Sequence, residues 1–169
     1  MKARIVSVLC ISAMLIASTA FAQLKAGSDE DKAFTKINQE KNADAKAQML
    51  QDFAKQFPQS KVMPQVWSML LDIASEKNDH AKIAEYGEQA VKADPQNVSA
   101  YLAVSRVYAM DGKNLETAVN YAQKAVENVG KMKAQPAPPN YTEAEWKDLI
   151  KQNEDAAQGT LNYAKAVKK

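Results

Sequence analysis

Histidine is the side chain that most often does acid–base or metal chemistry near neutral pH, and this 169-residue chain has only one, His80. It follows Asp79 where a helix is predicted to begin, so a surface histidine in a helix-capping region is favoured over a catalytic or metal-binding one. The chain contains no nucleotide-binding, serine-hydrolase or zinc-protease motif. Because nothing supplies a nucleophile with its base and orienting group, we predict a non-enzymatic protein with no catalytic, cofactor-binding or metal-binding residues.

The first 22 residues have the three parts of a secretory signal peptide. Lys2 and Arg4 precede an apolar run, residues 5–16, and small residues surround a break after Ala22. The run is too short to span a bilayer comfortably, so a retained membrane anchor is the weaker alternative. We expect a signal peptide over 1–22 that is cleaved after Ala22, no membrane insertion of the mature chain, and a periplasmic or secreted protein.

The predicted mature chain is neutral and lacks cysteine. Its 147 residues (169 minus 22) lose Lys2 and Arg4, which leaves 20 basic residues against 20 acidic ones. A nucleic-acid-binding protein needs a basic footprint, so we expect no nucleic-acid partner. Cys10, the only cysteine, lies within the predicted signal peptide. The mature protein would therefore form no disulfide and would depend on packing for its stability.

Apolar residues at helical spacing predict helices along most of the mature chain. Residues 23–28 are expected to be a flexible leader, and Gly130 begins a composition break with three prolines over 130–141 that favours an extended linker. The pattern Thr142-x-x-Glu145 is typical of a capping box at a helix start. Helices are predicted over 43–57, 63–76, 80–93 and 142–169. Apolar residues at helical spacing also occur from Ala33 to Ile37, from Val98 to Tyr108 and from Leu115 to Val126.

One pattern occurs twice in the central part of the chain, at a spacing of 34 or 35 residues. The corresponding pairs are Trp67 and Tyr101, Leu70 and Val104, Asn78 and Gly112, Ala90 and Ala125, and Val91 and Val126. A fixed period near 34 indicates a stacked array of helix–turn–helix units. An irregular alanine-rich helical bundle is the alternative interpretation.

These residues resemble the tetratricopeptide repeat (TPR) family. The preceding segment, with Phe53, Ala54, Phe57 and Pro58-x-Ser60, resembles the unit ending common in its bacterial exported or envelope members. The resemblance rests on Trp67, Leu70, Leu71, Ala74, Asn78, Asp79, Ala84, Ala90, Val91, Asp94 and Pro95, and on Tyr101, Val104, Ser105, Tyr108, Gly112, Ala118, Ala125 and Val126. It covers roughly residues 29–129. Ile83 and Gly87 depart from the family pattern within this range, and Gly130 departs from it directly after the range. It implies an all-α fold of stacked antiparallel helix pairs, a TPR-like α-solenoid of about three pairs. Residues 142–169 would then form a C-terminal capping helix.

The resemblance also implies a partner and a binding surface. In this family, peptides lie against the first helix of each pair, on the face away from the second helix. The corresponding residues here are Gln65, Ser68, Asp72, Ser75, Glu76, Ser99, Leu102, Arg106, Ala109 and Met110. We therefore expect a protein–protein interaction module, an adaptor or scaffold with a protein or peptide partner. A self-associating structural subunit and an accessory subunit of an envelope enzyme remain alternatives.

The C-terminal helix is expected to dock within the molecule. Its apolar stripe matches the face that a stack of three pairs would leave open near Ala122 and Val126. The stripe consists of Trp146, Leu149, Ile150, Ala157 and Leu161. In the competing interpretation, this helix binds a partner or mediates a homo-oligomer.

Overall fold

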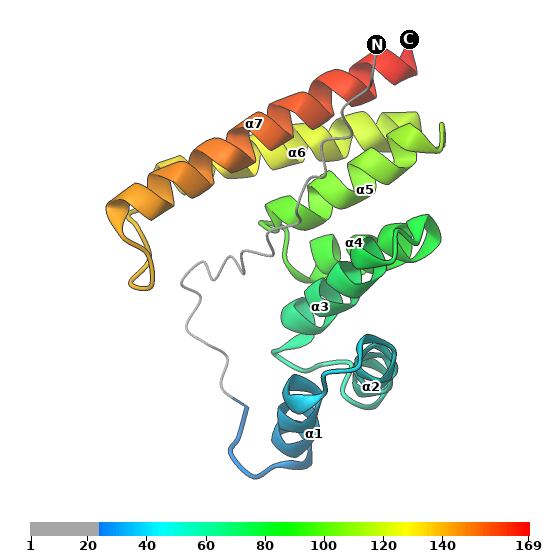
Figure 1. The fold of residues 1–169 in the computed structure, drawn as a ribbon, viewed down its shortest axis with the longest axis vertical. Helices are drawn as coiled ribbons and strands as arrows, with labels where there is room; N and C mark the ends of the chain where they lie inside the picture. Colours follow the sequence, from blue (N-terminus) through cyan, green and yellow to red (C-terminus); the bar gives the residue numbers. More distant parts are fainter. Residues whose placement is uncertain (1–23) are drawn as a thin grey trace.

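The computed structural model describes residues 24–169, which form seven α-helices (Figure 1). The predicted signal peptide and Gln23 lie outside these described residues. The helices are α1 (Asp29–Gln39), α2 (Ala43–Gln56), α3 (Met63–Glu76), α4 (His80–Ala93), α5 (Val98–Met110), α6 (Leu115–Lys133) and α7 (Glu143–Lys168).

Most helix starts are fixed by local capping groups. The side chains of Ser28, Asn42, Asp79 and Asn97 each accept a hydrogen bond from the backbone N–H three residues later, which satisfies a donor that the helix itself leaves unpaired. The predicted capping box of Thr142 is present at the start of α7. The bounds predicted for 63–76 and 80–93 are confirmed.

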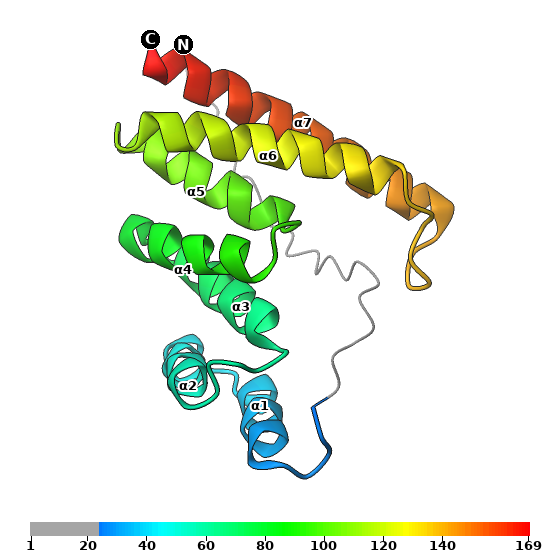
Figure 2. The ribbon, with the colours of Figure 1, turned by 180° about the vertical axis from the view of Figure 1, so that it is seen from behind.

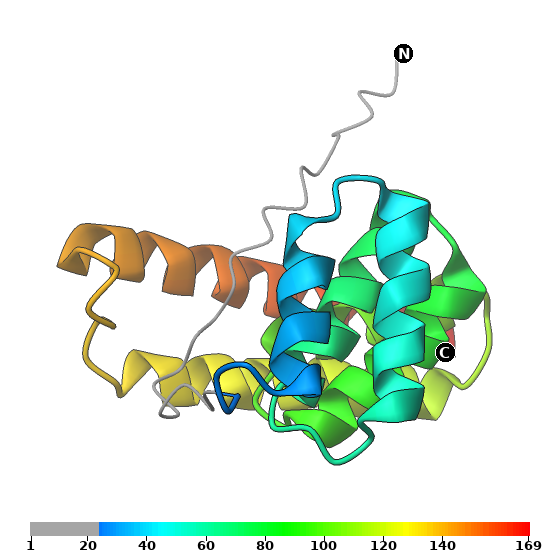
Figure 3. The same ribbon diagram turned by 90° about the horizontal axis from the view of Figure 1, so that it is seen from below.

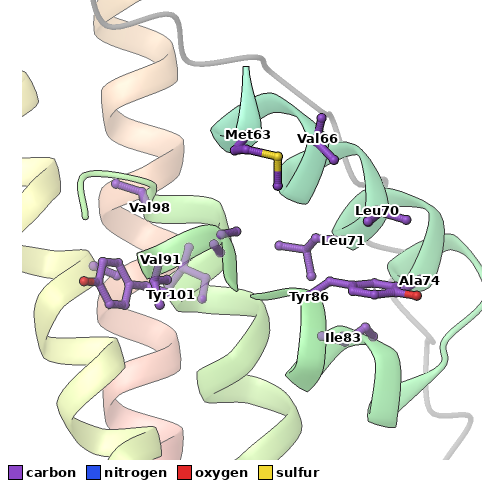
Figure 4. Packing of buried hydrophobic residues seen from close by; sticks show 14 of the residues in the cluster. Met63, Val66, Leu70, Leu71, Ala74, Ile83, Tyr86, Val91, Val98 and Tyr101 are labelled. Atoms are coloured by element: carbon purple, nitrogen blue, oxygen red, sulfur yellow. The ribbon is translucent and has the colours of Figure 1, made fainter. Parts of the chain in front are cut away.

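Each helix packs against its neighbours in sequence, and the prediction of an all-α fold is confirmed (Figures 1 and 2). Additional contacts join α3 to α5 and α5 to α7. Figure 4 shows the core between α3 and α4 continuing past Val91 toward Val98 and Tyr101 of α5. Ala90 and Ala125 are completely buried, because closely approaching helices leave room only for small side chains.

Two turns between helices have the same backbone feature. Asn78 after α3 has φ 52° and Gly112 after α5 has φ 64°. This left-handed conformation is the one that glycine and asparagine tolerate best at a helix end. Asn114 is also left-handed, with φ 49°. It lies between Gly112 and Ala125, where the spacing between the two copies of the pattern changes from 34 to 35 residues and one residue is therefore inserted.

Gly87 explains one departure from the TPR sequence pattern. A Cβ atom built on this residue of α4 would collide with Cγ2 of Val104 on α5 and would lie 3.7 Å from Cδ1 of Leu71. Glycine therefore allows α4 and α5 to approach closely. Glu88 adds a polar connection, because its carboxylate accepts hydrogen bonds from the hydroxyls of Tyr108 (3.1 Å) and Tyr121 (2.7 Å). These contacts connect α4 to both α5 and α6.

The chain between α6 and α7 differs from the expected linker. The predicted break at Gly130 is wrong, since α6 continues to Lys133. Val129 and Met132 are buried on the same helix, and their burial outweighs the roughly 1 kcal/mol that glycine costs inside a helix. The adjoining ends of α6 and α7 project beyond the other helices (Figure 3).

The C-terminal helix packs against α5 and α6, as predicted. Trp146, Ile150, Ala157 and Leu161 are buried along it, and Leu149 is partly buried. The indole N–H of Trp146 donates a weak hydrogen bond to the carbonyl of Gln135, at 3.4 Å. Helix α7 therefore forms part of the packed core with α5 and α6.

Candidate functional site

The predicted binding surface divides into an α3 half and an α5 half, and the α3 half lies on one side of its helix. Its members are Gln65, Ser68, Asp72, Ser75 and Glu76. Two of them already have partners within the protein: Ser68 Oγ accepts a hydrogen bond from Asn97 Nδ2 at 3.0 Å, and the Ser75 hydroxyl donates to the Leu71 carbonyl at 2.8 Å. The groups left for a partner are the acidic side chains and the amide of Gln65.

Asp72 has the most perturbed electrostatic environment on this surface. Burial, and secondarily the negative charge of Glu76 one turn away, raise the pKa of Asp72 from 3.8 to about 6. Neither carboxylate forms an ion pair with a cation of residues 24–169. Gln65 Oε1 is buried and has no hydrogen-bond partner. The α3 half therefore combines uncompensated negative charge with an unsatisfied acceptor.

The α5 half is not an open surface. Leu102 and Ala109 are buried, with exposed fractions of 7% and 2%, so these two predicted groove residues are covered in this structure. The physical reason is α7, which packs against α5: Ala164 and Ala109 share a small buried cluster with Ala118, and Arg106 Nε donates to Thr160 Oγ1 at 3.0 Å. Only Ser99, Arg106 and Met110 remain exposed on this helix side.

The structure also contains a cleft that the sequence did not indicate. It is an open cavity of about 590 Å³ between the end of α2, the start of α3 and the end of α4. We call it the Trp67 cleft. Its lining residues are Ala54, Pro58, Ser60, Lys61, Met63, Pro64, Trp67, Gln89, Lys92 and Ala93.

Trp67 connects this cleft to a second, smaller cavity. The smaller cavity, about 220 Å³, shares Ala54 and Trp67 with the Trp67 cleft and continues along the groove between α2 and α4. Trp67 is partly buried and stacks on Tyr86 with the ring centroids 6.3 Å apart. The sequence pattern indicated Trp67 only as a position of the repeat, so its partial exposure in the cleft was missed.

The single histidine has a polar partner. His80 Nδ1 lies 2.7 Å from Asp111 Oδ1, so the first turn of α4 is joined to the end of α5. Within residues 24–169, no three metal-ligating side chains come together, and no helix has the length and apolar character needed to cross a membrane.

Residues 24–169 define an all-α fold of seven helices packed in sequence, with an acidic surface on α3 and a basic aromatic cleft between α2 and α4. No protein-family model, curated protein or solved structure matches this chain.

Proposed function

We propose that this chain is a non-enzymatic protein-binding module, built as a TPR-like array of about three helix pairs that α7 caps. Features at corresponding positions of α3–α4 and α5–α6 support the repeat. They are the left-handed Asn78 and Gly112, the buried Ala90 and Ala125, and the aromatic pairs Trp67–Tyr86 and Tyr101–Tyr121. The predicted signal peptide supports export to the periplasm or beyond, in which case mass spectrometry of the mature chain should find Gln23 as its first residue.

The observation that carries the proposal is the uncompensated α3 surface. Keeping Asp72 partly buried beside Glu76 destabilises the isolated fold, because the raised pKa shows that the ionised form is disfavoured there. Groups that a fold holds at a cost to its own stability are frequent at functional sites. A cationic side chain from a partner would neutralise this pair.

Site-specific photocrosslinking in an envelope extract tests this proposal. A photoreactive residue at Glu76, which is exposed on the α3 surface, should capture a protein partner. The same residue at Lys151, an exposed position on α7, is the matched control. Capture from position 76 should fall when Asp72 is replaced by Asn. Equal capture from both positions would contradict the proposed surface.

Self-association is the second candidate function, and the end of the molecule around α5 and α7 favours it. Met110, Tyr163 and Val167 have exposed fractions of 59%, 44% and 37%. Ala109 and Ala164 belong to one small buried cluster with Ala118, which places the end of α5 near the last turns of α7. Light scattering that rises with concentration, and falls on Met110→Ser with Val167→Ser, would support a self-assembling subunit over a monomeric adaptor.

A further inference from the structure

We infer that the Trp67 cleft is a second binding site, on a different side of α3, for an extended acidic peptide segment of a protein partner. The inference rests on the proposed function of protein binding. It concerns the Trp67 cleft, which lies outside the acidic α3 surface, and it specifies the charge of the partner segment that would bind there. Trp67 and Asp72 are five residues apart, which separates them by about 140° around the helix axis. The cleft and the acidic α3 surface can therefore be occupied independently.

Charge selects an acidic ligand. Lys61 and Lys92 line the cleft, and no Asp or Glu is among its lining residues. Neither lysine forms an ion pair with a carboxylate of the described chain. The smaller cavity is lined by one acidic residue, Glu85, whose carboxylate already forms an ion pair with Lys82 at 2.8 Å. Two cations without internal partners complement carboxylates on a ligand.

The apolar lining selects a peptide over a small free anion. Apolar residues also line the cleft, namely the partly buried Trp67, the buried Met63, and the rings of Pro58 and Pro64. Rigid aromatic surfaces of this kind anchor partner side chains at interfaces. The two cavities meet at Trp67, so the track accommodates an elongated ligand whose acidic and apolar side chains alternate.

The cleft is preformed. Its loop is held by hydrogen bonds from Ser60 N–H to the Phe57 carbonyl (3.0 Å) and from Met63 N–H to the Ser60 carbonyl (3.2 Å). Ser60 Oγ accepts a further bond from Val62 N–H at 3.2 Å. Pro58 and Pro64 have fixed φ angles. A ligand therefore does not have to order this loop when it binds, which lowers the entropy cost of association.

Tryptophan fluorescence tests the inference directly, because the chain has only two tryptophans. In the Trp146→Phe chain, Trp67 is the single emitter. The probe is the blocked peptide Ac-Leu-Asp-Leu-Glu-Leu-NH₂, and its isosteric control is Ac-Leu-Asn-Leu-Gln-Leu-NH₂. We expect saturable changes in Trp67 emission with the acidic peptide. Lys61→Gln and Lys92→Gln should each weaken its binding about two- to fivefold, whereas Lys151→Gln should leave it unchanged.

Anisotropy of a fluorescein-labelled acidic peptide, titrated with the unaltered chain, gives the same affinities without a tryptophan substitution. Three outcomes would overturn the inference: no saturable binding, equal binding of the acidic and amide peptides, or wild-type affinity in both lysine variants. Competition by sodium acetate as strong as that by the peptide would show a simple anion site, and would overturn it too. Photocrosslinking from position 76 reports on the α3 surface separately, so it distinguishes failure here from failure of the proposed function.

Discussion

Gly87 offers the sharpest test of how the two central helix pairs meet. A methyl group added at this position of α4 would collide with Val104 Cγ2, and ordinary carbon–carbon contact would require the two helices to separate by more than about 1 Å. Val104 is completely buried, and valine in a helix has essentially one rotamer. The side chain therefore has no alternative position, and the added methyl must displace backbone.

The magnitude follows from two opposing terms. Replacing glycine by alanine inside a helix stabilises it by about 0.5–1 kcal/mol, whereas overpacking a core costs about 1–3 kcal/mol. The severity of the collision favours the upper part of that range. We expect Gly87→Ala to lower the free energy of unfolding by about 1–2 kcal/mol, measured by urea denaturation followed by circular dichroism.

The chain supplies matched controls for this experiment. Gly130 in α6 and Gly159 in α7 have no atom within 4 Å of an added Cβ, so Gly130→Ala and Gly159→Ala should stabilise the protein by about 0.5–1 kcal/mol. Val104→Ala removes the atom that would collide, so it should partly rescue Gly87→Ala, with a coupling energy of about 0.5–3 kcal/mol. A Gly87→Ala chain as stable as the Gly159→Ala chain would refute the close approach of α4 and α5.

Two further predictions concern Asp72 and α7. Because burial raises the pKa of Asp72 to about 6, its contribution to stability is present below about pH 4 and is lost as pH rises through 6. Asp72→Asn should therefore stabilise the fold at pH 7. The full pKa shift corresponds to a ceiling of about 3 kcal/mol, since one pKa unit is worth about 1.4 kcal/mol. Solvent screening reduces the expected gain to about 1–2 kcal/mol. That gain should vanish in denaturation at pH 3.5, and a gain independent of pH would contradict the reasoning. Truncation after Gln135 should uncover Leu102 and Ala109, lower the melting midpoint and increase light scattering, whereas an unchanged midpoint would show that α7 adds no stability.

Local signals in the sequence were sufficient to predict the bounds of α3 and α4. Asn78 and Asp79 determine the turn between α3 and α4 through one left-handed residue and one capping side chain, and both effects depend only on neighbouring residues. The break at Gly130 was wrong for the complementary reason. A glycine is a weak local signal, and the burial of Val129 and Met132 by tertiary packing decided the outcome.

The candidate sites were less predictable because they depend on where distant elements meet. Leu102 and Ala109 lie on the expected side of α5, but a helix that begins more than thirty residues later covers them. The Trp67 cleft is formed by the ends of three helices, and none of its residues has a sequence signature of binding. The raised pKa of Asp72 likewise depends on burial, which a periodic pattern indicates only coarsely.

The docking of α7 has a consequence for how partners can be bound. The proposed TPR-like array would expose the first helices of its units along one surface. In this structure α7 covers α5, whereas the acidic residues of α3 remain uncovered. On the α5 half that α7 covers, Arg106 donates a hydrogen bond to Thr160 of α7. On the α3 half, the carboxylates of Asp72 and Glu76 have no ion-pair partner among residues 24–169. The open part of the surface is therefore acidic, and the cleft between α2 and α4 is basic. A partner that placed cationic side chains on α3 and an acidic segment in the Trp67 cleft would satisfy both surfaces at once, and linking the two contacts would raise its affinity above that of either alone.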